Sequence, residues 1–227
     1  MLGPGWIHLL VAFGLGQADA GLPSPGLAEV LERAGASEAR RELLDCAFEE
    51  TTTVEELAKD GTVKGTFTRT HAIALEKGEL KRRTTVSESS TGEVSSLLTK
   101  EPPPPTKADA RKQRSAFHPA RQEEFRFRLA ELDAQGRAKV VYWPKEKSPE
   151  RAMGTAWLDA RSGALVSLDA TPSELPAHLD RMALHLDFED TACGVVAKQV
   201  TASGEGGFLL FTMRFRSRTT LSKHRVP

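Results

Sequence analysis

The sequence predicts an α+β fold that is mainly β: a curved antiparallel sheet of roughly ten strands, forming a half-open barrel covered by one or two helices. Three observations carry this prediction. Short apolar runs alternate with tight turns along most of the chain, only one long stretch has helical spacing, and connections are short. The clearest case is Gly154–Ala170, where Ala160–Gly163 separates two β-prone runs and Ser-Gly ends the turn.

Composition limits the class of protein. Of 227 residues, 39% are hydrophobic and 27% charged, as in an ordinary globular domain that needs no disulfide scaffold. The 31 Lys and Arg residues equal the 31 Asp and Glu residues in number. This balance argues against a general nucleic-acid binder, which usually carries a concentrated positive excess.

The beginning of the chain has the pattern of an export signal. Trp6–Leu15 is a short apolar run, and Ala18-Asp19-Ala20 fits the small-x-small cleavage pattern. The run is shorter than the about 20 residues that span a membrane. We therefore expect residues 1–20 to be a signal peptide and residues 21–227 to be a single β domain in the periplasm or secreted. A buried N-terminal segment is the alternative.

The chain has two cysteines, Cys46 and Cys193. In an oxidising compartment they could form a disulfide that closes a long loop. Alternatively they are two buried thiols, since free cysteine is often fully buried. The sequence leaves both alternatives open.

One stretch, residues 27–48, predicts a helix. Its apolar residues recur at spacings of three and four, its opposite face is charged, and Gly35 is a possible interruption. Such an amphipathic helix would lie over the sheet.

Strands are predicted from alternation and turn residues. We expect Gly61, Gly78, Gly136 and Gly163 to lie at hairpin turns with positive φ. Residues 88–100 are rich in Ser and Thr and follow the expected strand 80–87, and Ser203–Gly207 is expected to be a turn. The expected strands are 54–57, 63–75, 80–87, 125–132, 138–144, the two arms of 154–170, 179–188, 195–202 and 208–220.

Pro102–Pro105 favours an extended segment. Lys107–Arg114 follows as a basic, helix-competent piece, either a contact for anionic lipid or a partner, or a solvated connector.

No catalytic or metal-binding motif is evident, so we predict neither an enzyme nor a cofactor. The six histidines form no zinc spacing, and no Gly-x-Ser-x-Gly elbow or Cys-x-x-Cys pair is present. Gly204–Gly207 precedes a strand, whereas a phosphate-binding loop opens a helix.

Aromatic residues could line an apolar pocket on the concave face of the sheet. The candidate ligand-binding residues are Trp143, Trp157, Phe188 and Phe211. The alternative is a filled core, because small closed sheets are usually packed by their own side chains.

Two stretches resemble a known family. The hairpins TTTVEELAKDGTVKGTFTRTHAIALEKGELKRRTTV are similar to the leading hairpins of the outer-membrane lipoprotein carrier (LolA/LolB) fold. The closing strands of that fold are resembled by three later segments, VVYWP, GTAWLDARSGALVSLDA and FTMRFRSRTTLSKHR. The resemblance covers roughly residues 51–225 and implies a half-open barrel around helices, with a hydrophobic interior, in the bacterial periplasm. Lacking a cysteine at the cleavage site, the chain resembles the soluble carrier more than the anchored acceptor.

The resemblance implies a periplasmic binding or carrier protein for lipidated or apolar ligands, with lipid or lipoprotein as partner. The alternative is a non-catalytic envelope structural or protein-interaction domain with a filled core. A hydrolase ranks third, because the motifs supply no pair of nucleophile and base.

Overall fold

The computed structural model describes residues 25–101, 114–177, 179–208 and 211–227. The expected signal peptide (residues 1–20), Pro102–Pro105 and residues 107–113 of the basic segment lie outside this part of the chain. Removal of residues 1–20 and the nature of the basic segment therefore stay predictions.

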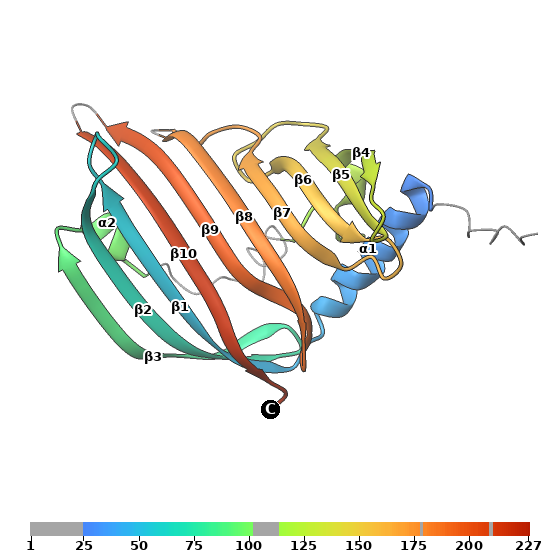
Figure 1. The fold of residues 1–227 in the computed structure, drawn as a ribbon, viewed down its shortest axis with the longest axis horizontal. Coiled ribbons are helices and arrows are strands. Elements are labelled where there is room, and N and C mark those ends of the chain that lie inside the picture. Colours follow the sequence, from blue (N-terminus) through green and yellow to red (C-terminus); the bar gives the residue numbers. More distant parts are fainter. Residues whose placement is uncertain (1–24, 102–113, 178, 209–210) are drawn as a thin grey trace, which may run out of the picture.

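Ten antiparallel strands form one sheet in the order β3-β2-β1-β10-β9-β8-β7-β6-β5-β4 (Figure 1). β3 and β4 are the edges, so the sheet is not closed, and the predicted mainly β, half-open architecture is confirmed. The strands are β1 (Cys46–Leu57), β2 (Val63–Glu76), β3 (Glu79–Gly92), β4 (Phe125–Leu132), β5 (Arg137–Pro144), β6 (Ala152–Asp159), β7 (Leu165–Pro172), β8 (Leu179–Thr191), β9 (Gly194–Phe208) and β10 (Phe211–Arg225).

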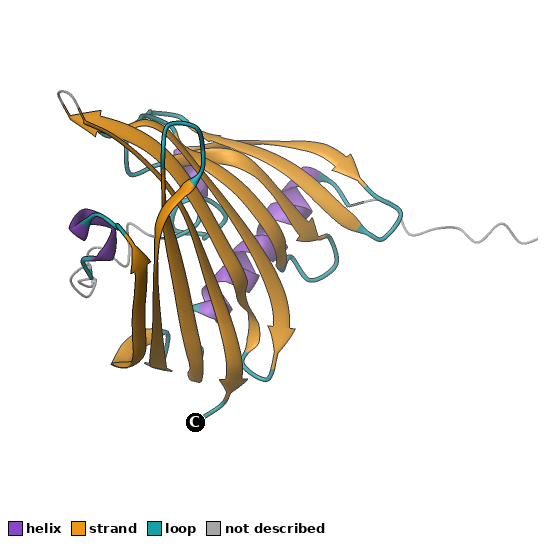
Figure 2. Ribbon diagram, turned by 60° about the vertical axis from the view of Figure 1, so that its left-hand side comes forward, coloured by secondary structure: helices purple, strands orange, loops and turns teal. Residues whose placement is uncertain are grey.

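The main helix, α1 (Leu27–Arg41), lies across one face of the sheet, behind β4–β7 (Figures 1 and 2). It is shorter than predicted, because Cys46–Phe48 pair with β2 and so belong to β1. Gly35 does not interrupt it. A Cβ there would lie 3.0 Å from Nε2 of Gln122, so the glycine allows a close approach. Two short helical pieces, α2 (Ser96–Thr99) and η1 (Gln122–Glu124), complete the described helices.

Three strand boundaries differ from prediction. β1 begins at Cys46, not at Val54, because its Thr-rich part pairs on both sides, with β2 and β10. β3 continues to Gly92, beyond the strand predicted to end at Ser87. The turn predicted at Ser203–Gly207 is wrong, since β9 runs through it to Phe208.

The run of glycines in β9 has a packing reason. Gly204 pairs with Phe215 of β10, and a Cβ at Gly204 would lie 2.5 Å from the Phe215 ring. Glycine inside a strand here marks a close approach of an aromatic ring, not a turn.

The four predicted turn glycines do lie at hairpin turns. Their φ angles are positive: 86° at Gly61, 71° at Gly78, 76° at Gly136 and 74° at Gly163. Because a residue with a Cβ rarely adopts this region, glycine is the residue that these tight turns require.

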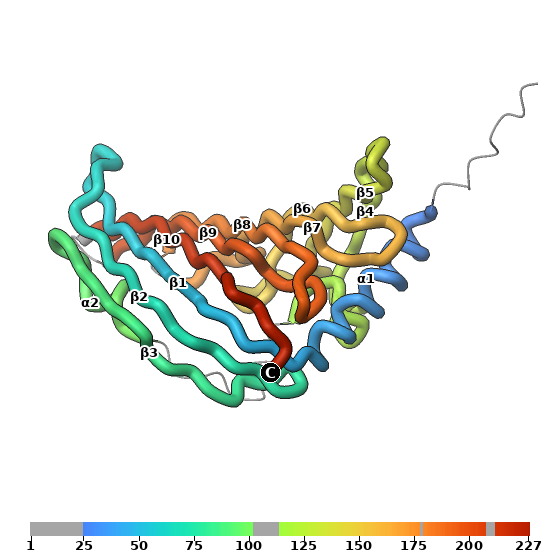
Figure 3. The backbone as a smooth tube through the Cα atoms, turned by 60° about the horizontal axis from the view of Figure 1, so that its bottom comes forward, coloured from blue at the N-terminus to red at the C-terminus, as the bar shows by residue number. Residues whose placement is uncertain are grey.

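The sheet has an inner face, covered in part by α1, and an outer face, and it curls into a trough (Figure 3). Along β5, Ala138, Val140 and Tyr142 are buried against the inner side, while the residues between them face outward. The core lies between α1 and β4–β7. Its buried members are Val30, Ala34, Ala116, Phe117, Phe125, Ala138, Val140, Tyr142, Ala156, Leu158, Ala160 and Leu165.

Cys46 and Cys193 form a disulfide, with Cα atoms 5.6 Å apart. It joins the start of β1 to the turn between β8 and β9, and both cysteines are buried. The bond therefore connects parts of the sheet that are 147 residues apart in sequence.

Candidate functional site

The inner face is filled where α1 covers it. Phe117, fully buried, packs its ring 5.4 Å from Tyr142 and 5.5 Å from Phe127. Val30 and Ala34 of α1 are also fully buried against this layer. In this half of the molecule the filled-core expectation describes the structure.

A cavity of about 250 Å³ begins where α1 ends. We call it the inner cavity. Its apolar wall comes from Leu168 of β7 and from Leu184, Leu186 and Phe188 of β8. The spacing of two in β8 places these three side chains on the inner face together. The other lining residues are Arg41, Arg114, Ser115, Ala116, Arg121, Phe125, Tyr142, Glu150, Ala152, Leu165 and Ala170.

Three arginines border the inner cavity, and each has a carboxylate partner. Arg41 contacts Glu38 at 3.0 Å, and Arg121 contacts Glu124 at 3.3 Å. Arg114 donates to both carboxylate oxygens of Glu42. The border is therefore neutralised, which leaves the apolar wall as the feature that distinguishes the cavity.

Glu42 shows the strength of this pairing. Partial burial raises the pKa of its carboxyl, but the hydrogen bond from Arg114 and the charges of His118 and Arg114 outweigh it. The net result is a pKa below the ordinary value. Glu42 thus stays ionised and holds Arg114 at the border of the cavity.

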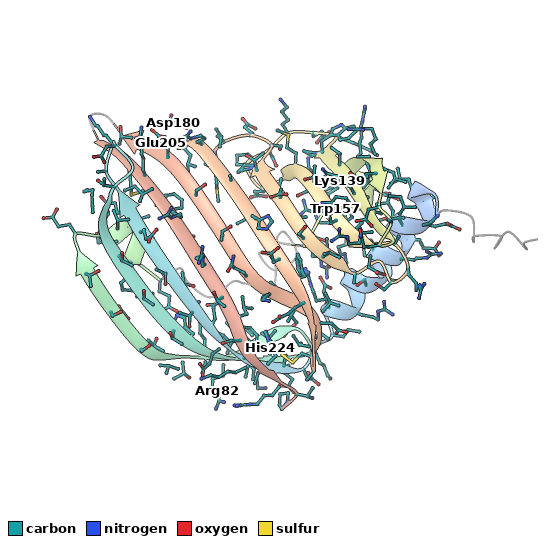
Figure 4. All side chains as sticks on the ribbon, in the orientation of Figure 1. Arg82, Lys139, Trp157, Asp180, Glu205 and His224 are labelled. Carbon is teal, nitrogen blue, oxygen red and sulfur yellow. A yellow bond between two sulfur atoms is a disulfide. The ribbon has the colours of Figure 1, made fainter. Side chains whose placement is uncertain are left out.

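The structure does not bring the four predicted ligand-binding residues together. Phe188 lines the inner cavity, with the Arg41 guanidinium 5.6 Å from its ring centre. Trp157 lies on the outer face, beside Lys139 (Figure 4), with Arg137 and Lys139 5.3 Å and 5.5 Å from its ring. Trp143, next to buried Tyr142, also faces outward. The side chain of Phe211 lies outside the described part of the structure.

Sequence reasoning missed the leucines of the apolar wall. The alternation of Leu184, Leu186 and Phe188 in the sequence predicted a strand. It did not show that α1 leaves this part of the inner face uncovered. Ligand binding at the four aromatic positions stays a prediction.

Toward β1–β3 the inner face becomes charged. Arg69 pairs with Glu88 at 3.2 Å, and Arg83 pairs with Glu50 at 3.2 Å. His71, only 2% exposed, lies between them, with Nε2 3.6 Å from Glu101. Burial, and then the charge of Arg83, lower the pKa of His71. An apolar ligand would therefore favour the β7–β8 side.

The outer face carries a second and larger space of about 460 Å³, which we call the outer hollow. Asp169 of β7 and His185 of β8 are cross-strand partners in its wall, with Oδ1 and Nδ1 2.7 Å apart. The hydrogen bond to Asp169, together with the charge of Asp187, raises the pKa of His185. The remaining lining residues are Met153, Gly154, Thr155, Ala170, Thr171, Ala183, Leu184, Thr201, Ala202, Ser203 and Arg216.

Among the described residues, no cluster of His, Cys, Asp and Glu has an arrangement that could hold a metal ion. Within the same part of the chain, no helix is long and apolar enough to cross a membrane.

No protein family model and no curated protein matches the sequence. Solved structures do match in fold. A LolA superfamily protein from Nitrosomonas europaea has a TM-score of 0.34 at 9% identity, over 88% of this chain and 93% of its own. A DUF1329 family protein from Desulfovibrio piger has a TM-score of 0.39 at 12% identity, over 88% and 92%. The MucA/MucB complex of Pseudomonas aeruginosa has a TM-score of 0.26 at 10% identity, over 86% and 94%. In fold, then, this chain is similar to LolA-like structures, at low sequence identity.

Proposed function

We propose that the protein is a non-catalytic binding or carrier protein for an apolar chain, such as the acyl chain of a lipid, in the bacterial envelope. The observation that carries the proposal is the inner cavity, whose wall of three leucines and Phe188 lies beyond the end of α1. Apolar walls with few polar groups are typical of sites for hydrophobic ligands. Burying a chain there removes apolar surface from water on both partners.

The disulfide supports the envelope part of the proposal. Disulfides persist in oxidising compartments and are rare in the reducing cytosol. Both cysteines of the described chain are used in this one bond.

The test is calorimetric titration of the intact protein with saturated fatty acids of increasing chain length. Intrinsic tryptophan fluorescence is a poor probe here, because Trp143 and Trp157 face outward. We expect saturable binding that strengthens with chain length by about 0.8 kcal/mol per buried methylene until the cavity is full. Thermal stability should rise with ligand, by about 2.7 kcal/mol at a concentration 100-fold above Kd.

A matched pair of variants locates the site. Leu186→Trp places a large ring in the inner cavity and should abolish the stabilisation by ligand. Gln199→Trp adds the same ring to the outer face of β9 and should leave it unchanged. If neither fatty acids nor alkyl amines of any length bind the wild type, the proposal is overturned and the protein is instead a protein-interaction domain.

A further inference from the structure

The inner cavity and the outer hollow lie back to back on the same place in the sheet. Ala170 of β7 and Leu184 of β8 line both of them. These two residues are also the last cross-strand partners between β7 and β8. The two spaces therefore lie on either side of the sheet at the point where the two strands stop pairing.

The pairing of β7 with β8 is unusually short. It joins only Ser167–Ala170 to Leu184–Asp187, whereas β8 pairs with β9 from Leu179 to Thr191. β7 then ends at Pro172, which has no N–H to donate to a ladder. The ribbons of β7 and β8 diverge beyond this point in Figure 1.

After Pro172 the chain turns away from β8. The backbone N–H of Ser173 donates to the Arg151 carbonyl at 2.7 Å, and its hydroxyl donates to the Ser148 carbonyl. Among the described residues, one side-chain hydrogen bond crosses the split: Oγ1 of Thr171 donates to the Met182 carbonyl at 2.8 Å. A single neutral hydrogen bond of this kind contributes little net stability.

We propose that this split is a passage through the sheet for a single-chain amphiphile. The apolar chain lies in the inner cavity, and a head group that donates hydrogen bonds lies in the outer hollow. The proposal rests on the proposed function and adds to it the route and the class of ligand.

The outer hollow selects the head group through its acceptors. The side chain of Asp169 is 63% exposed there, and Thr155, Thr201 and Ser203 add hydroxyls. Its one guanidinium, on Arg216, is paired with Glu55. The ring of His185 lies between two carboxylates, with Nδ1 2.7 Å from Asp169 and Nε2 3.2 Å from Asp187. The net charge of the three side chains is therefore negative even when His185 is protonated. Ammonium and hydroxyl head groups fit these walls, and a carboxylate does not.

The passage is tested by closing it. Thr171→Cys with Ala183→Cys places two thiols on the outer face, one residue beyond the last pair, and Thr171→Ser with Ala183→Ser is the unbridged control. Peptide mapping confirms that the new bond forms beside Cys46–Cys193. We expect the bridged form to take up dodecylamine more slowly than the control by at least about tenfold.

The outcomes separate the two proposals. If the bridged and control forms take up dodecylamine at one rate, the passage is disproved while binding in the inner cavity stands. If the wild type binds neither dodecylamine nor a fatty acid, both proposals are overturned. Thr171→Val, which removes the hydrogen bond across the split, should accelerate uptake, and slower uptake in this variant would count against the passage.

The head group is tested at equal chain length with dodecylamine, dodecyl glucoside and laurate. We expect the amine and the glucoside to bind more tightly than laurate by about tenfold, the factor that one charge-assisted hydrogen bond supplies. Asp169→Asn should remove most of the difference for the amine. Glu76→Gln, which removes a negative charge at the end of β2 that does not line the hollow or pair with a residue that does, should preserve it. Equal affinity for all three in the wild type would refute the assignment of the head group.

Discussion

At the scale of single residues, two histidines on opposite faces respond oppositely to their surroundings. On the inner face, burial and Arg83 lower the pKa of His71. On the outer face, the Asp169 hydrogen bond and the Asp187 charge raise the pKa of His185. Folding therefore disfavours the charged form of His71 and favours that of His185.

The His71→Gln variant tests this difference. The lowered pKa of His71 means that the unfolded chain binds the proton more readily, so its contribution to stability is present above the unfolded pKa and is lost as pH falls. Between about pH 7 and 5, wild-type stability should fall more steeply than that of the variant. Urea unfolding at several pH values measures the two slopes.

His185→Gln is the control with the opposite sign. The stabilisation by protonated His185 is complete below the unfolded pKa and is lost as pH rises through the raised folded pKa. Above about pH 6.5, the free energy of unfolding should therefore fall less with rising pH in His185→Gln than in the wild type. A steeper acid slope in His71→Gln than in the wild type would contradict the interpretation.

The candidate site shows what residue types alone can predict. Phe188 does lie in the wall of the inner cavity, because it continues the alternating apolar positions of β8, which face that cavity. Trp143 and Trp157 are as bulky, but the parity of β5 and β6 turns them outward. Parity depends on which neighbour is buried under α1, and that contact is not encoded in the local pattern.

At the scale of elements, the β6–β7 turn packs directly against α1 and is hydrogen-bonded to it. Nη1 of Arg33 donates to the Ala160 carbonyl at 2.7 Å. In the same turn a Cβ at Gly163 would lie 2.1 Å from the Arg33 carbonyl carbon, in the backbone of the helix. The turn therefore needs glycine for two reasons, positive φ and the closeness of α1.

Gly163→Ala and Gly136→Ala separate these reasons. Both glycines have positive φ, but no atom lies within 4 Å of a Cβ at Gly136. We expect Gly136→Ala to lower the free energy of unfolding by about 1 kcal/mol, from backbone strain. Gly163→Ala should lower it by a further 1–3 kcal/mol, roughly, because α1 must move. Urea denaturation measures both, and equal losses would show that α1 does not depend on this contact.

Most elements were predictable because the turns that bound them use residues with special backbone geometry. A glycine with positive φ marks each of the four predicted hairpin turns, at positions 61, 78, 136 and 163, and the alternation of apolar and polar residues predicted the strands between them. The errors at Cys46–Phe48 and in β9 have one cause, strand pairing that the local residue pattern does not show. Cys46–Phe48 pair with β2, and Gly204 lies in β9 because the ring of Phe215 on β10, not a turn, occupies the space beside it.

At the scale of the whole molecule, the disulfide closes a loop of 147 residues across the sheet. In the chain-entropy account, a cross-link over such a length stabilises the fold by about 4–5 kcal/mol. Cys46→Ser with Cys193→Ser should lower the free energy of unfolding by about that amount. Urea denaturation of the purified variant measures the loss, and hydrogen exchange should quicken most in β1–β3. Unchanged stability would show that the sheet alone holds these strands.

The strand order has a consequence for how the chain acquires its structure. Eight of the ten strands, β2–β9, lie beside sequence neighbours only. The exception is the pairing of β1 with β10. The hydroxyls of Thr52 and Thr219 meet at 2.9 Å although 167 residues separate them. Because β10 is the last strand of the described chain, the edge of β1 stays unpaired until β10 joins it. Such distant pairing makes folding slow, and a chain that stops before β10 would leave two sheets with unpaired edges that invite aggregation.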